Sequence, residues 1–156
     1  YTVALSYGCV LRKGESMTSE RVMARVGPSI MPILHAQWEA GHGPGADLGM
    51  RPDPETAEAY NAYIGEYSDT RGTPDDRQYL DVHRGHMVFL KPGEEQFITP
   101  TTLSRTLTGT GPEIIEKLER MEATGIDNIA ISVTDAQGAR DLIQDFGREV
   151  ISPQSM

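Results

Sequence analysis

Apolar residues recur along this chain at two spacings, and these spacings predict both strands and helices. From about residue 2 to residue 12, alternate positions are apolar, which is the period of a β-strand. Between residues 16 and 40, apolar residues recur every three or four positions, with an interruption at Gly27-Pro28. This pattern predicts two helical stretches. Asp53-Pro54-Glu55 is a typical helix start and predicts a third helix.

The last third of the chain predicts a regular alternation of strands and helices over residues 103–153. A strand ends near residue 108, residues 109–112 form a turn, and residues 113–121 have the spacing of an amphipathic helix. Residues 128–133 are mostly apolar, which predicts a strand buried on both faces, and a final helix follows. Strands separated by helices of this length pair in parallel. Either a doubly wound α/β sheet or a (β/α)8 barrel fits this pattern.

Composition limits the class of protein. The 156 residues, of which 38% are hydrophobic, suffice for one packed core, so we expect residues 1–156 to form a single domain. Residues 41–100 are rich in turn-forming and polar positions, which predicts a loop-rich, partly helical insertion region. The formal net charge of -9 argues against a nucleic-acid-binding surface, because such a surface needs clustered Lys and Arg.

Three residues whose side chains could take part in chemistry or binding are expected to pack in the core instead. Cys9 is the single cysteine, so the chain cannot form an internal disulfide, and the thiol is expected to act as a small apolar group. His35 and Trp38 are expected to be buried on the helix that ends near residue 40. With neither a signal-peptide pattern nor an apolar run of membrane-spanning length, we expect a cytoplasmic protein without membrane contact.

A glycine turn, Gly109-Thr110-Gly111, opens the predicted helix at 113–121. Backbone N–H groups at the positive end of a helix dipole attract anions, so the turn can bind a phosphate group. It can also be an ordinary tight turn in which Thr110 or a neighbour caps the helix. Both interpretations fit the sequence alone.

His83, Arg84 and His86 are the second group of candidate residues. They can form a polar, hydrogen-bonding surface group, or contact a substrate or an anionic cofactor to which Arg84 adds positive charge. Two imidazoles one helical turn apart can also share a metal ion, but the spacing differs from that of zinc proteases. We therefore assign no metal from the sequence. The nearby run of Glu94 and Glu95 is expected to be solvated.

The chain from the glycine turn to its end resembles the C-terminal part of the luciferase-like monooxygenase superfamily. The resemblance is carried by the segments GTGPEIIEKL at 109–118, ATGIDNIAI at 123–131 and FGREVISP at 146–153. An earlier segment, LRKGE at 11–15, resembles a subgroup whose second half is enlarged. The family consists of flavin- or deazaflavin-dependent oxidoreductases built on a TIM barrel.

This resemblance implies an α/β fold that is the C-terminal portion of a (β/α)8 TIM barrel. It implies FMN or the deazaflavin coenzyme F-420 as the cofactor, with Gly109, Thr110 and Gly111 helping to hold the cofactor phosphate. The activity is then hydride transfer with reduced F-420, or FMN-dependent monooxygenation of a small organic substrate. His83 and His86, with Arg84 between them, become candidate substrate or cofactor contacts. No catalytic residue is assigned.

A TIM barrel needs about 250 residues, and this chain begins with the pattern of a strand interior. We therefore expect a missing N-terminal half or a partner chain, and a homo-oligomer. Two alternatives remain at this point. One is a metal-dependent hydrolase that uses His83 and His86, and the other is a non-catalytic half-barrel subunit.

Overall fold

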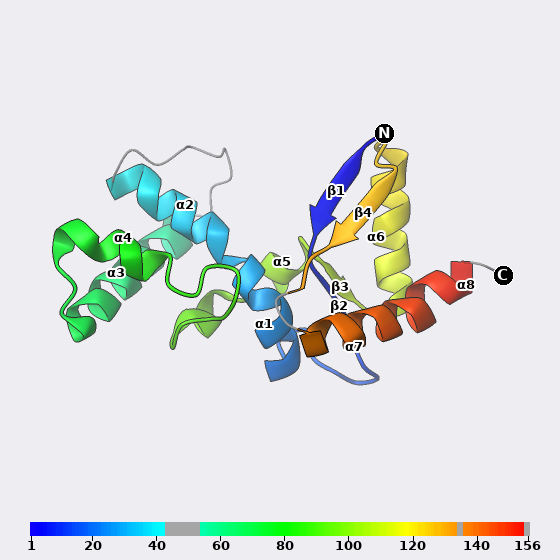
Figure 1. The fold of residues 1–156 in the computed structure, drawn as a ribbon, viewed down its shortest axis with the longest axis horizontal. Coiled ribbons are helices and arrows are strands. Elements are labelled where there is room, and N and C mark those ends of the chain that lie inside the picture. The colour runs from blue at the N-terminus through cyan, green and yellow to red at the C-terminus, as the bar shows by residue number, and fades with distance from the viewer. Residues whose placement is uncertain (43–53, 134–135, 155–156) are drawn as a thin grey trace. The chain divides into compact units, whose positions relative to one another are not determined.

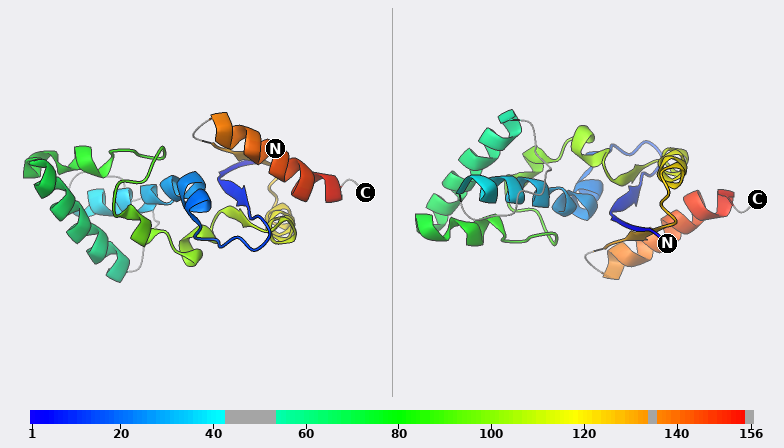
Figure 2. Two further views of the ribbon diagram at one scale, coloured as in Figure 1. Left: turned by 90° about the horizontal axis from the view of Figure 1, so that it is seen from below. Right: turned by 90° about the horizontal axis from the view of Figure 1, so that it is seen from above.

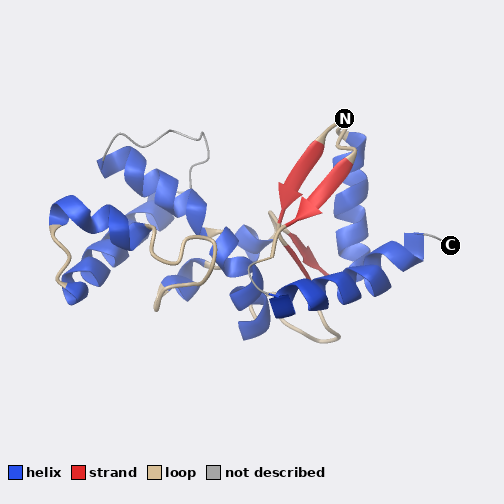
Figure 3. Cartoon of the chain, viewed as in Figure 1, coloured by secondary structure: helices blue, strands red, loops and turns tan. Residues whose placement is uncertain are grey.

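The computed structural model describes residues 1–42, 54–133 and 136–154 of the chain (Figure 1). The chain divides into two units. Unit 1 contains Tyr1–Val26 and Ile98–Met156, and unit 2 contains Gly27–Phe97. All strands of the described residues lie in unit 1, whereas unit 2 consists of helices, turns and loops (Figure 3). The fold class is therefore mixed α/β, as the sequence predicts.

The strands of unit 1 pair in parallel. Strand β1 (Val3–Ser6) pairs with β4 (Asn128–Ile131), and β2 (Gly8–Val10) pairs with β3 (Leu107–Gly109). The single strand expected over residues 2–12 is thus two short strands with different partners. The division falls at Tyr7, whose carbonyl already accepts the N–H of Leu107 at 2.8 Å.

Helices α6 (Gly111–Ala123) and α7 (Ala136–Phe146) form the core of unit 1 together with these strands. The two helices lie at a steep angle to each other, and α6 is seen nearly along its axis in Figure 2. The core cluster joins residues of β2, β3, α6, α7 and the π-helix η4 (Gly147–Ile151). Its buried members are Val10, Leu107, Ile114, Phe146 and Val150.

The sheet of β1 and β4 is covered on one face only, which corrects the expectation that residues 128–133 are buried on both faces. Ile129 and Ile131 pack against the core cluster, whereas Asn128 and Ala130 are exposed. In the parallel register Leu5 lies beside Ala130 and is 67% exposed, so the open face continues onto β1. Within the described residues, β4 has β1 as its only strand partner.

Three shorter helices complete unit 1. Helix α1 (Glu20–Val26) follows β2 and buries Val22 and Val26. Helix α5 (Pro100–Leu103) leads into β3, and α8 (Ser152–Gln154) continues from η4. Among the described residues, none of the helices combines the length and apolar character needed to cross a bilayer.

Unit 2 is built from α2 (Met31–His42), α3 (Pro54–Arg71) and α4 (Gln78–Val82). Short 3-10 helices lie at Gly27–Ser29, Asp75–Arg77 and Glu94–Phe97, and are labelled η1, η2 and η3. The interior is rich in aromatic rings, with the centroids of Tyr60 and Phe97 5.3 Å apart in an edge-to-face arrangement. Trp38 is 7% exposed, which confirms its predicted place in the core.

Candidate functional site

The Gly109-Thr110-Gly111 turn joins the end of β3 to the start of α6, where the sequence places it. Thr110 is the N-cap, and both its N–H and its hydroxyl donate to Oε2 of Glu113, at 2.7 and 2.8 Å. These bonds, the backbone one first, lower the pKa of Glu113. A carboxylate therefore already lies against the N-terminus of α6, at the position where a phosphate would be attracted.

Both glycines of this turn also have packing roles. Gly111 is buried, and a Cβ at this position would lie 2.5 Å from the carbonyl oxygen of Glu149 in η4. A Cβ at Gly109 would lie 3.1 Å from Oε2 of Glu113. The close approach of backbone to backbone explains why position 111 is a glycine, whether or not the turn binds an anion.

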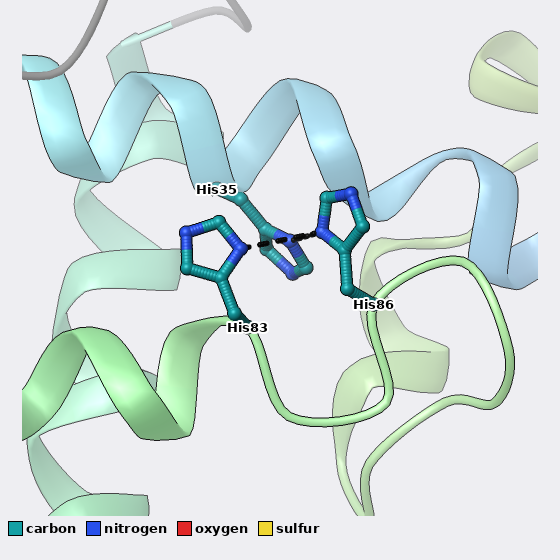
Figure 4. Close-up of side chains that lie close together, drawn as sticks. All are labelled: His35, His83 and His86. Atoms are coloured by element: carbon teal, nitrogen blue, oxygen red, sulfur yellow. Dashed lines mark hydrogen bonds between the residues drawn. The ribbon is translucent and has the colours of Figure 1, made fainter.

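The second candidate site is a cluster of three histidines in unit 2 (Figure 4), here called the histidine cluster: His35, His83 and His86. His35 lies on α2 and is 2% exposed. His83 follows α4 directly, and His86 lies in the turn that comes next, in which the His86 N–H donates to the His83 carbonyl at 3.0 Å. Gly85 permits this turn with a φ of 74°.

The ring nitrogens of the three histidines converge. Nδ1 of His86 lies 2.8 Å from Nδ1 of His35 and 3.4 Å from Nδ1 of His83. One nitrogen from each ring lies within 4.8 Å of the other two. His83 and His86 thus come together as a candidate pair, but through a turn and not along a helix, because α4 ends at Val82. Arg84, between them in sequence, is exposed.

Two carboxylates lie behind the histidine cluster. Oε1 of Glu39 is 2.7 Å from Nε2 of His83, and Oε1 of Glu94 is 4.0 Å from Nε2 of His35. The ionised Glu39 carboxylate can only accept a hydrogen bond from His83. When His83 is neutral, its proton is therefore on Nε2, and its Nδ1 carries a lone pair. Glu94 is 1% exposed, which corrects the expectation that it is solvated.

Burial affects the protonation of two of the three histidines, His35 and His86. Burial lowers the pKa of His35, against the opposing effect of Glu94. Burial, followed by the nearby His83, lowers the pKa of His86. Both rings are therefore held toward their neutral form, in which each has one nitrogen that can accept a hydrogen bond or bind a cation.

Sequence reasoning found His83 and His86 but did not connect them with His35, Glu39 or Glu94. One local signal was present: Glu39 follows His35 by four positions, so both lie on the same side of α2. The histidine cluster belongs to unit 2 and the glycine turn to unit 1, and each stands as a site by itself. Comparisons of the chain with protein-family models, curated proteins and solved structures give no match.

Proposed function

We propose that this chain is part of a flavin- or deazaflavin-dependent oxidoreductase of the luciferase-like class. The observation that carries the proposal is the succession of β3, the glycine turn, α6, β4 and α7. These elements coincide with the residues on which the family resemblance rests. The parallel pairing of all the described strands supports a further proposal, that unit 1 is the C-terminal portion of a (β/α)8 barrel.

In this proposal the cofactor is FMN or coenzyme F-420, and it supplies the redox chemistry toward a small organic substrate. The barrel would be completed by a further segment or by another chain, and the exposed face of β1 and β4 is consistent with that. Leu5 on this face is 67% exposed and Val3 is 53% exposed. Association of copies into a homo-oligomer is part of the same proposal.

The glycine turn can hold a cofactor phosphate only if the Glu113 carboxylate first moves away from the N–H and hydroxyl of Thr110. Pro112 has no N–H to offer, and the N–H of Thr110 is already taken by Glu113. A phosphate close to Glu113 would also meet repulsion between like charges. The role of Gly109, Thr110 and Gly111 in phosphate binding therefore depends on a specific movement, and that movement can be tested.

The test is a fluorescence titration of the protein with coenzyme F-420 and, in parallel, with FMN. Saturable binding of one of them is expected. If the phosphate lies at the turn, Glu113→Gln should strengthen binding because it removes the competing charge. Glu116→Gln is the matched control, since Glu116 is exposed on the same helix and pairs with Arg120.

Each outcome of the titration has a separate meaning. Binding that is unchanged in Glu113→Gln would remove the glycine turn from the cofactor site but leave the oxidoreductase proposal in place. Binding of neither cofactor by the folded protein would overturn the proposal itself.

Among the described residues, the carboxylates nearest the histidine cluster do not favour the metal-dependent hydrolase. Many metal-dependent hydrolases use a carboxylate base that faces the open ligand position. The two carboxylates beside the histidine cluster are already engaged, because Glu39 accepts from His83 and Glu94 pairs with Lys91 at 2.6 Å. Neither is placed as a free base toward a metal-bound water.

A further inference from the structure

While its rings are neutral, the histidine cluster brings together more nitrogen lone pairs than there are protons between them. Nδ1 of His83 carries a lone pair, because its proton is directed to Glu39 from Nε2. If Nδ1 of His86 also carries a lone pair, the two lone pairs face each other at 3.4 Å. If His86 carries the proton on Nδ1, the lone pairs of His35 and His83 converge on that one hydrogen. In either arrangement of neutral rings, at least two lone pairs point to a common centre.

A cation at that centre could bind the converging lone pairs. The separations between the ring nitrogens are close to those in a metal site. Zinc–imidazole bonds of about 2.0–2.1 Å in a tetrahedron place neighbouring ligand nitrogens roughly 3.3 Å apart. Two Nδ1–Nδ1 separations in the cluster, 2.8 Å for His35–His86 and 3.4 Å for His83–His86, lie on either side of this value. The His35–His86 pair would need to open by about half an ångström.

The groups behind the rings match those of a metal centre. A metal-binding histidine usually donates its second N–H to a carboxylate, which fixes the ring and raises its basicity. Glu39 holds His83 in this way at 2.7 Å, and Glu94 lies 4.0 Å from Nε2 of His35. Nε2 of His35 is a buried atom without a hydrogen-bond partner, and it faces that carboxylate. When Nδ1 of His35 binds a cation, the proton of the neutral ring is on Nε2, and this N–H can donate to Glu94.

We propose that His35, His83 and His86 bind a divalent transition-metal ion, with Zn²⁺ as the best match, through their Nδ1 atoms. Glu39 and Glu94 act as positioning residues that orient His83 and His35. Three protein ligands leave the fourth tetrahedral position to a water or a small anion, and the partial exposure of His83 and His86 provides access to it. The proposal concerns unit 2 alone and does not depend on the oxidoreductase assignment.

The experiment uses the full chain after removal of metals by a chelator. Zn²⁺ is titrated in competition with a chromophoric chelator, and Co²⁺ is added in parallel to report coordination through its visible spectrum. One equivalent of Zn²⁺ should bind, and Co²⁺ should give the intense bands of a four-coordinate site. His83→Ala and His86→Ala should each lower the Zn²⁺ affinity by at least 10-fold, a loss of about 1.4 kcal/mol or more.

His42→Ala is the matched control, because His42 is the remaining histidine of the chain and lies on α2 outside the cluster. Its affinity for Zn²⁺ should equal that of the unsubstituted protein. Glu39→Gln should weaken binding by roughly 10–100-fold, as removal of a metal ligand's carboxylate partner does. His35 is buried, so its substitution can affect folding, and the test therefore depends on the half-buried His83 and His86.

Three results would overturn the proposal. The first is no Zn²⁺ binding by protein whose circular dichroism shows it folded. The second is equal Zn²⁺ affinity in the His83→Ala, His86→Ala and His42→Ala variants. The third is a weak, six-coordinate Co²⁺ spectrum, because that would contradict a site built from three imidazoles and one exchangeable ligand.

Discussion

The Nζ atom of Lys91 lies 2.6 Å from Oε1 of Glu94, and the two side chains are 0% and 1% exposed. Lys91 Nζ also donates to the carbonyl of Val82 at 2.9 Å, and the Lys91 N–H donates to Oε2 of Glu94 at 2.7 Å. The pair therefore joins the end of α4 to η3. A buried charge is tolerated in this way, because each ion is matched by the other and by further hydrogen bonds.

Breaking this pair on one side should destabilise the protein strongly. Lys91→Met leaves the Glu94 carboxylate buried without its counter-ion, and Glu94→Gln does the same to the Lys91 ammonium. Each change should lower the free energy of unfolding by about 3–5 kcal/mol. The measurement is urea denaturation followed by circular dichroism.

Two variants make this prediction specific. The double variant Lys91→Met with Glu94→Leu should recover much of the loss, because a buried ion pair can be replaced by apolar groups with little net cost. Glu95→Gln, on the exposed neighbour, should change the free energy of unfolding by less than about 0.5 kcal/mol. Single variants that unfold at the same urea concentration as Glu95→Gln would contradict the argument.

A second ion pair, in unit 1, should make stability depend on pH. Glu15 accepts from Nε of Arg21 at 2.8 Å and also bonds to Nη2 of the same guanidinium. Arg21 Nη2 in turn donates to the carbonyl of Val10 at 2.9 Å. The hydrogen bond from Arg21 is the main cause that lowers the pKa of Glu15 to about 2, from 4.5.

Because the pKa of Glu15 is lower in the folded protein than in the unfolded chain, its contribution to stability is present above pH 4.5. It is lost as the pH falls from there toward 2. Glu15→Gln should therefore cost about 1–3 kcal/mol near neutral pH, and this difference should shrink toward pH 2.5. Denaturation curves of both proteins at several pH values test this. Glu20→Gln, on the exposed start of α1, is the matched control.

The single cysteine should be unreactive in the folded protein. Cys9 lies in β2 and is 2% exposed, and burial raises the pKa of its thiol. Thiolate is the reactive form, so labelling by an aromatic disulfide reagent must await local opening. An opening free energy of about 3 kcal/mol slows labelling by roughly 100-fold or more.

The matched comparison for Cys9 is Lys13→Cys in a Cys9→Ala background, since Lys13 is exposed in the turn after β2. The engineered thiol should react rapidly, and in denaturant both proteins should react at similar rates. Fast native labelling of Cys9 would show that the β2–β3 region opens readily.

The sequence was most informative where the structure is set by neighbouring residues. The β3–α6–β4 segment was predictable because Thr110 and Glu113 form a local cap and the apolar positions of α6 repeat at helical spacing. The division of residues 2–12 into two strands was not predictable. It depends on which strand pairs with each half, and these partners lie 99 and 125 positions away along the chain.

The histidine cluster was likewise not predictable, because it depends on contacts between residues far apart in the sequence. Spacing rules connect residues within one helix or strand, whereas His35 and His86 are 51 positions apart and meet only through the packing of unit 2. The sequence predicts a solvated Glu94, because adjacent acidic residues usually lie in solvent, and this prediction is wrong. Its burial is possible because Lys91, three positions earlier, is buried with it.

The start of α6 packs closely against η4 at Gly111. A Cβ at Gly111 would lie 2.5 Å from the carbonyl oxygen of Glu149 and 3.1 Å from its Cβ. The first of these contacts is with backbone, so no side-chain rotation can relieve it. Gly111→Ala should therefore force α6 and η4 apart and lower the free energy of unfolding by about 1–3 kcal/mol.

Gly147→Ala is the internal comparison for this prediction, because a Cβ at Gly147 meets no atom within 4 Å. Alanine restricts the unfolded chain more than glycine does, so this variant should be neutral or more stable by up to about 1 kcal/mol. If urea denaturation shows that Gly111→Ala lowers the free energy of unfolding and Gly147→Ala does not, the destabilisation arises at the contact between Gly111 and Glu149. If Gly111→Ala were as stable as Gly147→Ala, the close approach of η4 to α6 would not limit this position, and binding at the turn would become the better reason for its glycine.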